Sequence, residues 1–146
     1  MTNYKILDIS YKKLSYRRAC VFGSIYVGEE ICNSIKNGLI EKGDPIVLAE
    51  IAGINAIKNT SNFVILSHPI NIENAFLHIS VDYVNYNVFV YCFVFAHSKT
   101  GVEIEAMVGT FAALLTIYDL TKKINPFSHI NNVSLIFKDG GESPIG

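Results

Sequence analysis

The stretch NIENAFLHISVDYVNYNVFVYCFVFA, residues 71–96, carries the pattern that decides the fold. Its first half, residues 71–83, alternates apolar side chains with others at the two-residue period of a strand. One face of that strand would carry Ala75, Leu77, Ile79 and Val81. Residues 84–87, VNYN, predict a turn, and the apolar run at 88–96 predicts a second strand. We therefore predict an antiparallel hairpin.

A long helix follows the hairpin. Residues 100–124, TGVEIEAMVGTFAALLTIYDLTKKI, are apolar around most of the helix circumference, which is typical of a buried helix. Thr100 and Glu103 form a T-x-x-E pattern that predicts a capping box at the helix start. Residues 130–138 then predict a final strand, followed by a glycine-containing tail at 139–146.

The residues before the hairpin predict one strand and two helices. Residues 17–27 are apolar on both alternating sets, as in a central strand. Residues 28–38 predict a short helix and residues 42–59 a second one. In the second helix Asp44 is a suitable N-cap and Pro45 suits the first helical position.

Several features complete the expected organisation. Gly53, inside the second helix, disfavours it by about 1 kcal/mol relative to alanine, which suggests close packing against another backbone. Residues 60–70 predict an extended loop because Pro69 disfavours a helical residue before it. We expect residues 1–16 to form a partly ordered arm. The element order βαββαβ predicts an α+β fold, a ferredoxin-like sandwich with an antiparallel sheet and helices on one face. We expect residues 1–146 to form one domain.

Composition narrows the function classes. The chain is 50% hydrophobic and only 17% charged, below the roughly 25% of soluble domains, which suggests subunit interfaces. A net charge of −1 is unlike the basic footprint of nucleic-acid-binding proteins.

The three cysteines form no C-x-x-C pair, so we expect no metal site and a reducing, cytoplasmic location. We expect no signal peptide, and the longest apolar run has nine residues where a membrane span needs about twenty.

Asp119 and Lys122 are the first candidate catalytic residues. At 100° per residue, Asp119 shares a narrow polar stripe of the long helix with Glu105, and Lys122 lies beside that stripe. If a second subunit covers the helix, the stripe lines a cleft. The pair is then either an acid–base pair on a rigid element or a surface ion pair worth roughly a few tenths of a kcal/mol.

Three further residues have a functional and a structural interpretation. Lys42 precedes a helix N-terminus, where free N–H groups and a lysine suit a phosphate, but an exposed lysine beside a capped helix looks the same. Lys58 closes that helix, where a cation also favours the dipole. His68 lies in an apolar loop and is either a ligand contact or a packed side chain. The sequence contains no P-loop, Rossmann fingerprint or G-x-S-x-G motif.

Four segments of the chain form specific motifs: KGDPIVLAEIAGINAIKNT (42–60), LSHPI (66–70), KTGVEIEAMVGTFAALLTIYDLTKK (99–123) and KDGGES (138–143). Together they resemble the molybdenum cofactor biosynthesis protein C family, the cyclic pyranopterin monophosphate synthases. The similarity extends from about Leu7 to the C-terminus without a gap between Arg17 and Lys138.

The resemblance implies a ferredoxin-like fold and a specific reaction. The family converts 3′,8-cyclo-7,8-dihydro-GTP to cyclic pyranopterin monophosphate and releases pyrophosphate, without a redox cofactor. It assembles as a homohexamer, a trimer of dimers, with its sites between subunits. Lysines suit the neutralisation of a triphosphate, and an Asp/Lys pair suits the proton transfers.

The family's site residues transfer to this chain by matching motifs. Asp119 and Lys122 match the catalytic aspartate and lysine. The matched substrate-binding residues are Leu66, Ser67, His68, Ile104, Glu105, Lys42, Lys58, Arg17 and Lys138. Lys99 and Glu103 also match, but their places at the start of the long helix leave their share in catalysis open.

Some positions depart from the family pattern. Ser67 replaces a cysteine and Ile65 replaces a proline. Asn59 and Glu142 replace basic residues, and each change removes positive charge from a region expected to face a triphosphate. We expect an active enzyme because the Asp119 and Lys122 pair is intact. The alternative is a diverged module that binds a nucleotide, or acts as a scaffold, without turnover.

Overall fold

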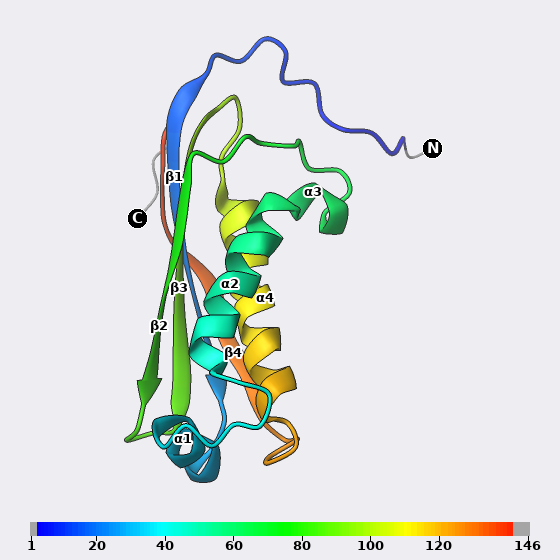
Figure 1. Cartoon of the computed structure of the whole chain (residues 1–146). Coiled ribbons are helices and arrows are strands. Elements are labelled where there is room, and N and C mark those ends of the chain that lie inside the picture. The colour runs from blue at the N-terminus through cyan, green and yellow to red at the C-terminus, as the bar shows by residue number, and fades with distance from the viewer. Residues whose placement is uncertain (1–2, 142–146) are drawn as a thin grey trace.

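The computed structural model describes residues 3–141, which form eight helices and strands (Figure 1). In chain order the elements are β1 (Ser15–Tyr26), α1 (Glu29–Lys36), α2 (Pro45–Lys58), α3 (Thr60–Phe63), β2 (Asn74–Asp82), β3 (Asn87–Ser98), α4 (Glu103–Thr121) and β4 (His129–Asp139).

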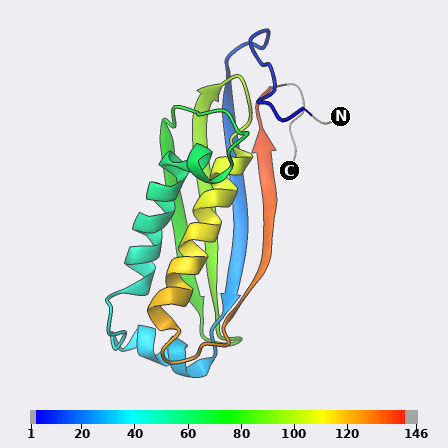
Figure 2. The ribbon, with the colours of Figure 1, turned by 90° about the vertical axis from the view of Figure 1, so that its right-hand side faces the viewer.

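The four strands form one sheet in the order β2-β3-β1-β4, and each neighbouring pair is antiparallel. Helices α2 and α4 run side by side along one face of this sheet, as Figures 1 and 2 both show. Helix α1 lies at one end, within the first crossover. This arrangement confirms the predicted α+β, ferredoxin-like fold.

The predicted hairpin is confirmed as β2 and β3. Leu77 pairs with Cys92 in its register, and both side chains are buried in the core. The turn is stabilised by Asp82, whose Oδ1 accepts hydrogen bonds from the backbone N–H groups of Val84 (3.0 Å) and Asn85 (3.3 Å). A carboxylate that bonds its own backbone two residues on is a common way to close such a turn.

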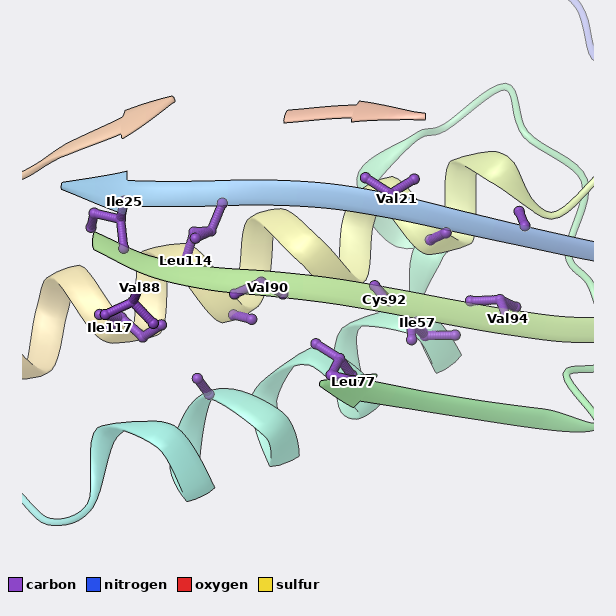
Figure 3. Packing of buried hydrophobic residues seen from close by; sticks show 14 of the residues in the cluster. Val21, Ile25, Ile57, Leu77, Val88, Val90, Cys92, Val94, Leu114 and Ile117 are labelled. Atoms are coloured by element: carbon purple, nitrogen blue, oxygen red, sulfur yellow. The ribbon is translucent and has the colours of Figure 1, made fainter. Parts of the chain in front are cut away.

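The hydrophobic core lies between the sheet and helices α2 and α4 (Figure 3). Strand β3 alternates buried and partly exposed residues along its length, so one face of the strand enters the core. Val90 of β3, Leu114 and Ile117 of α4, and Ile57 of α2 lie in this core and are nearly inaccessible to water. Each such side chain contributes about 1.5–3 kcal/mol of burial free energy.

Two glycines let α2 and α4 approach each other and the sheet. A Cβ on Gly53 would lie 3.1 Å from the backbone oxygen of Gly109 and 2.6 Å from a Leu77 methyl. A Cβ on Gly109 would lie 2.8 Å from the sulfur of Cys92. The close packing that Gly53 suggested is therefore confirmed. Helix α2 also begins as predicted, with Asp44 accepting from the N–H groups of the first turn.

Two predictions of local structure are wrong. The predicted capping box does not form: α4 begins at Glu103, its N-cap is Val102, and no side chain caps it. The carboxylate of Glu103 instead lies 3.3 Å from Lys138 Nζ on β4, so a tertiary ion pair replaces the local contact. Residues 60–63, expected to be extended, form the short helix α3, in which Thr60 Oγ1 donates to Ile57 O.

Helix α4 is long and apolar enough, by length and composition, to cross a membrane. In the structure it is the central core helix: Ala106, Ala113, Leu114 and Ile117 are fully buried against the sheet. Core helices of soluble proteins can have the same apolar composition, because they pack against the rest of the fold.

Candidate active site

Three charged side chains meet where α4 ends and α2 begins. Lys122 Nζ lies 2.8 Å from Asp119 Oδ1, and Lys42 Nζ lies 3.6 Å from Asp119 Oδ2. All three side chains are about half exposed, and they line a cavity of about 440 Å³ that opens to solvent. We call Lys42, Asp119 and Lys122 the acid–base cluster.

The loop between α1 and α2 brings Lys42 to this cluster. Gly38 and Gly43 have φ angles of 67° and 127°, in the region that glycine adopts without strain. They allow the chain to turn twice within six residues, so that Lys42 faces the end of α4. An ion pair of 3.2 Å between Glu41 and Lys123 joins the same loop to the residues after α4.

The charges in the cluster fix each group's protonation. Hydrogen bonding and charge from Lys122, followed by the charge of Lys42, lower the pKa of Asp119 below its usual 3.8. The hydrogen bond and charge of Asp119 raise the pKa of Lys122 above its usual 10.5. At neutral pH Asp119 is therefore ionised and Lys122 is positively charged.

A second set of charges lies at the opposite end of α4, where the helix begins. Glu103 pairs with Lys138, as described above, and Arg17 of β1 donates to the backbone oxygens of Ser98 and Lys99. These residues lie beside a cavity of about 650 Å³ lined by Tyr11, Lys12, Lys13, Ser15, Arg17, Lys138, Gly140 and Gly141. We call this cavity the basic pocket.

Lys12 and Lys13 of the basic pocket were not among the residues predicted from the sequence. Both precede β1 in the N-terminal arm, which has no hydrophobic period. The available signal was charge alone: two adjacent lysines lie four or five residues before Arg17. The pocket thus gathers four cations, and within residues 3–141 the one carboxylate that pairs with any of them is Glu103, on Lys138. Such a concentration of positive charge suits an anion.

Glu105 is a buried carboxyl group on the first turn of α4. Only 3% of the residue is exposed, and its Oε1 has no hydrogen-bond partner within residues 3–141. Burial, with a smaller contribution from the charge of Glu103, raises the pKa of Glu105 to about 7. Glu105 is therefore partly protonated near neutral pH and is able both to donate and to accept a proton.

The loop between α3 and β2, which contains Leu66, Ser67 and His68, lies at the same end of the molecule as the start of α4 (Figure 1). His68 Nε2 lies 2.7 Å from the backbone oxygen of Leu7 in the N-terminal arm. Ser67 Oγ donates to Val64 O, while the Leu66 side chain is exposed. Ile104 is also partly exposed, next to buried Glu105 on α4.

Within one chain the candidate residues therefore fall into two groups. The acid–base cluster lies where α4 ends, and the basic pocket lies near where α4 begins, with Glu105 and the loop after α3 at that end. Glu105 and Asp119 are fourteen residues apart on α4, so at ~1.5 Å per residue their backbones are about 21 Å apart.

Lys58 ends α2 as an exposed residue and forms no ion pair within the described part of the chain. The predicted cleft-facing stripe is thus buried at Glu105 but open to solvent at Asp119, whose side chain is 55% exposed.

One position that departs from the motif pattern, Asn59, has a structural role. Asn59 Nδ2 donates to Asn55 O at 2.8 Å, so this residue completes the C-terminal end of α2. Glu142 lies outside the described residues. Within residues 3–141 no group of three His, Cys, Asp or Glu side chains is placed to hold a metal ion.

Comparison with known proteins places the chain in a family. Residues 6–141 match the model of the MoaC family. The chain is 38% identical over 141 residues to the cyclic pyranopterin monophosphate synthase of Thermoanaerobacter sp. (strain X514), covering 97% of this chain and 89% of that protein. It is 40% identical over 145 residues to the probable cyclic pyranopterin monophosphate synthase of Sulfurisphaera tokodaii, covering 94% and 95%. On both grounds, the chain belongs to the MoaC family.

Proposed function

We propose that this protein is a cyclic pyranopterin monophosphate synthase. It converts 3′,8-cyclo-7,8-dihydro-GTP to cyclic pyranopterin monophosphate and pyrophosphate in molybdenum cofactor biosynthesis. The observation that carries this proposal is the acid–base cluster on a chain of this family: Asp119 is hydrogen-bonded to Lys122, and Lys42 reaches the other carboxylate oxygen. No observation on this chain favours binding without turnover.

The acid–base cluster supplies the proton transfers. Asp119, whose pKa is lowered by Lys122 and Lys42, accepts a proton from the substrate. Lys122 donates one, and its helix-end position fixes the distance between the two groups. Lys42 offers a second cation beside them. Groups held on a rigid element keep the short distances that general acid–base catalysis requires.

The basic pocket binds the phosphate groups. Arg17 and Lys138, with Lys12 and Lys13 of the arm, offer four positive charges to the triphosphate and to the pyrophosphate that leaves. Cations placed where charge develops lower the barrier to displacement of a phosphate group. The loop that follows α3 and the start of α4 lie at the same end of the molecule. Their residues Leu66, Ser67, His68, Ile104 and Glu105 contact the rest of the substrate.

One copy of the chain does not bring these two groups together. Because about 21 Å of helix separates them, we infer that the acid–base cluster of one copy meets the basic pocket of a second copy. The shared site accounts for Lys58, which has no partner in the described residues of its own chain. It also accounts for the half exposure of Asp119 in a single copy.

Two uncovered apolar surfaces support a homohexamer built as a trimer of dimers. The first is the sheet face opposite the helices, where Phe76 stacks on Phe93 (4.7 Å between ring centroids) and Phe22 lies 5.0 Å from Tyr91. The second is the outer face of α2 and α4. Its exposed apolar residues are Val47, Ile51, Ile104, Phe111 and Leu115. A trimer of dimers needs two different interfaces, and each surface is suited to one.

We place the protein in the cytoplasm. All three cysteines are buried and unpaired, and burial raises the pKa of Cys20 to about 11 and that of Cys92 to about 12. Such thiols are protonated and unreactive, and free cysteines persist in a reducing compartment.

Single-turnover formation of product tests the catalytic assignment. Asp119→Asn is expected to lower the rate at least ~10²-fold, as loss of an acid–base group does. The matched control is Glu50→Gln, the same carboxylate-to-amide change at an exposed position on α2 that does not line this cavity. Thermal melting of each variant shows whether the fold is kept. A folded Asp119→Asn protein with normal turnover contradicts the assignment, and wild-type protein that binds substrate without releasing pyrophosphate supports a binding module.

Mixed assemblies test the shared site. Asp119→Asn and Arg17→Ala are each expected to be inactive alone, because each destroys one half of every site. Assembled together from unfolded chains, they should recover about a quarter of the wild-type activity, since random pairing leaves that share of sites intact. Mixtures as inactive as the single variants would show that both residues act within one chain.

A further inference from the structure

The N-terminal arm, residues 3–14, is weakly attached to the rest of the protein. Every residue of the arm except Ile9 is exposed. Two hydrogen bonds join it to the other described residues: His68 Nε2 with Leu7 O at 2.7 Å, and Lys99 Nζ to Ser10 O at 3.5 Å. Figure 1 shows the arm running from the start of β1 across the end of the molecule near α3.

Apolar packing does not hold the arm in this position. Tyr4 is 85% exposed and Tyr11 76%, and Leu7 and Leu14 are also largely exposed. Little hydrophobic free energy is therefore lost when the arm moves, because these side chains are already in contact with water. Segments held by few buried contacts and by exposed hydrogen bonds are the ones that open most easily.

The arm nevertheless contacts both His68 and the basic pocket. The Leu7 carbonyl oxygen can only accept a hydrogen bond, so His68 Nε2 is the donor and carries the proton. Five residues further along, Lys12 and Lys13 line the basic pocket with Arg17 and Lys138. In the absence of an anion, like charges oppose each other in this pocket, and a bound phosphate reverses that repulsion.

We propose that the arm is a lid that responds to phosphate. Without ligand, the Leu7 carbonyl accepts the hydrogen bond from His68 Nε2. A phosphate or pyrophosphate group in the basic pocket draws Lys12 and Lys13 toward it, and the arm turns about the residue that precedes β1. Leu7 then leaves His68, whose N–H becomes free for the substrate. This inference rests on the proposed function, because it takes the basic pocket as the phosphate site.

The lid gives the enzyme an order of events. The triphosphate binds to the basic pocket before the hydrogen bond between His68 and Leu7 breaks. A ligand without phosphates therefore leaves that hydrogen bond intact. The arm also covers the phosphates once it has closed, which reduces their contact with water. Both effects come from one segment because Leu7 and Lys12 are separated by only five residues of chain.

A single tryptophan on the arm makes its motion measurable. The chain contains no tryptophan, so Tyr4→Trp in the full-length protein is the only indole and lies on the exposed arm. Inorganic pyrophosphate is titrated in, its binding is followed by calorimetry, and the indole is followed by fluorescence anisotropy. We expect a saturable anisotropy change at the concentration at which binding occurs, together with a shift of the His68 Nε2 signal in ¹⁵N NMR.

Charge removal on the arm separates the lid from the pocket. Lys12→Met with Lys13→Met, in the Tyr4→Trp protein, should weaken pyrophosphate binding by about three- to tenfold and abolish the anisotropy change even at saturation. The matched control is Lys5→Met, which removes an arm lysine that does not line the pocket and should respond normally.

The outcomes distinguish the lid from the proposed function. Pyrophosphate that binds without changing the indole or the His68 signal overturns the lid and leaves the phosphate site in place. An equal response in the Lys12 and Lys13 double variant also overturns the lid. Absence of any pyrophosphate binding to the protein with the wild-type lysines overturns both the phosphate site and the lid that depends on it.

Discussion

Replacement of Glu105 by glutamine should make the stability of the protein less dependent on pH. Glu105 is 3% exposed, and burial, together with the charge of Glu103, raises its pKa from the usual 4.5 to about 7. Its folded-state pKa is therefore above its unfolded-state value. The group favours the folded state below pH 4.5, and this advantage is lost as the pH rises toward 7.

The magnitude follows from the shift. A difference of about 2.5 pKa units, at 1.36 kcal/mol per unit, corresponds to about 3 kcal/mol between the two ends of this pH range. Glutamine has nearly the same shape and does not titrate. Relative to wild type, Glu105→Gln should therefore gain roughly 2–3 kcal/mol of unfolding free energy between pH 5 and pH 8.

Urea unfolding of both proteins at pH 5 and pH 8, at one fixed protein concentration, measures this difference. Any constant cost of burying the amide cancels, because only the change with pH is used. The control is Glu50→Gln, an exposed position on α2, where the two proteins should stay within about 0.5 kcal/mol at each pH. A difference between wild type and Glu105→Gln that does not change with pH would refute the reasoning that Glu105 is held protonated by burial.

Three other substitutions test the fold and the site. Gly109→Ala should destabilise the protein by about 1–3 kcal/mol in thermal or urea unfolding, because its Cβ would lie 2.8 Å from Cys92 Sγ; unchanged stability would mean that the helix–sheet contact is looser. Asp44→Ala should lose about 1 kcal/mol by removing the cap of α2, and an equal loss in Asp44→Ser would contradict a capping role. Lys42→Met should move the acid limb of the pH–rate profile to higher pH, because Lys122 first and Lys42 second lower the pKa of Asp119; an unmoved limb would show that Lys42 does not act on that carboxylate during turnover.

Local sequence patterns alone predicted the four strands and the three longer helices. The alternation in residues 71–83, the turn after it and the apolar run at 88–96 specify the β2–β3 hairpin, since side-chain period and turn chemistry are local properties. The start of α2 was also predictable, because Asp44 and Pro45 act on the first turn of their own helix. The motifs alone indicated the family, and the match of residues 6–141 to the family model agrees with them.

Local sequence patterns do not predict structure where a distant residue makes the deciding contact. The expected capping box failed because Glu103 pairs with Lys138, a residue on β4 that lies thirty-five positions further along the chain. The short helix α3 was missed because nothing in residues 60–63 shows a period over so few residues.

The division of the candidate site into two groups is visible only in three dimensions. From sequence, Glu105 and Asp119 lie on one stripe of one helix and look like parts of one site. In the structure Glu105 is buried at the start of α4, the end of the helix near the basic pocket. Asp119 is exposed beside Lys42, about 21 Å away along the helix. The structure also placed Lys12 and Lys13 in the basic pocket, for which the sequence offered charge alone, and Leu7 on His68, for which the arm has no sequence signal. The physical reason is that periodicity reports which face of an element is buried, whereas the meeting of charges depends on where the ends of several elements lie in space.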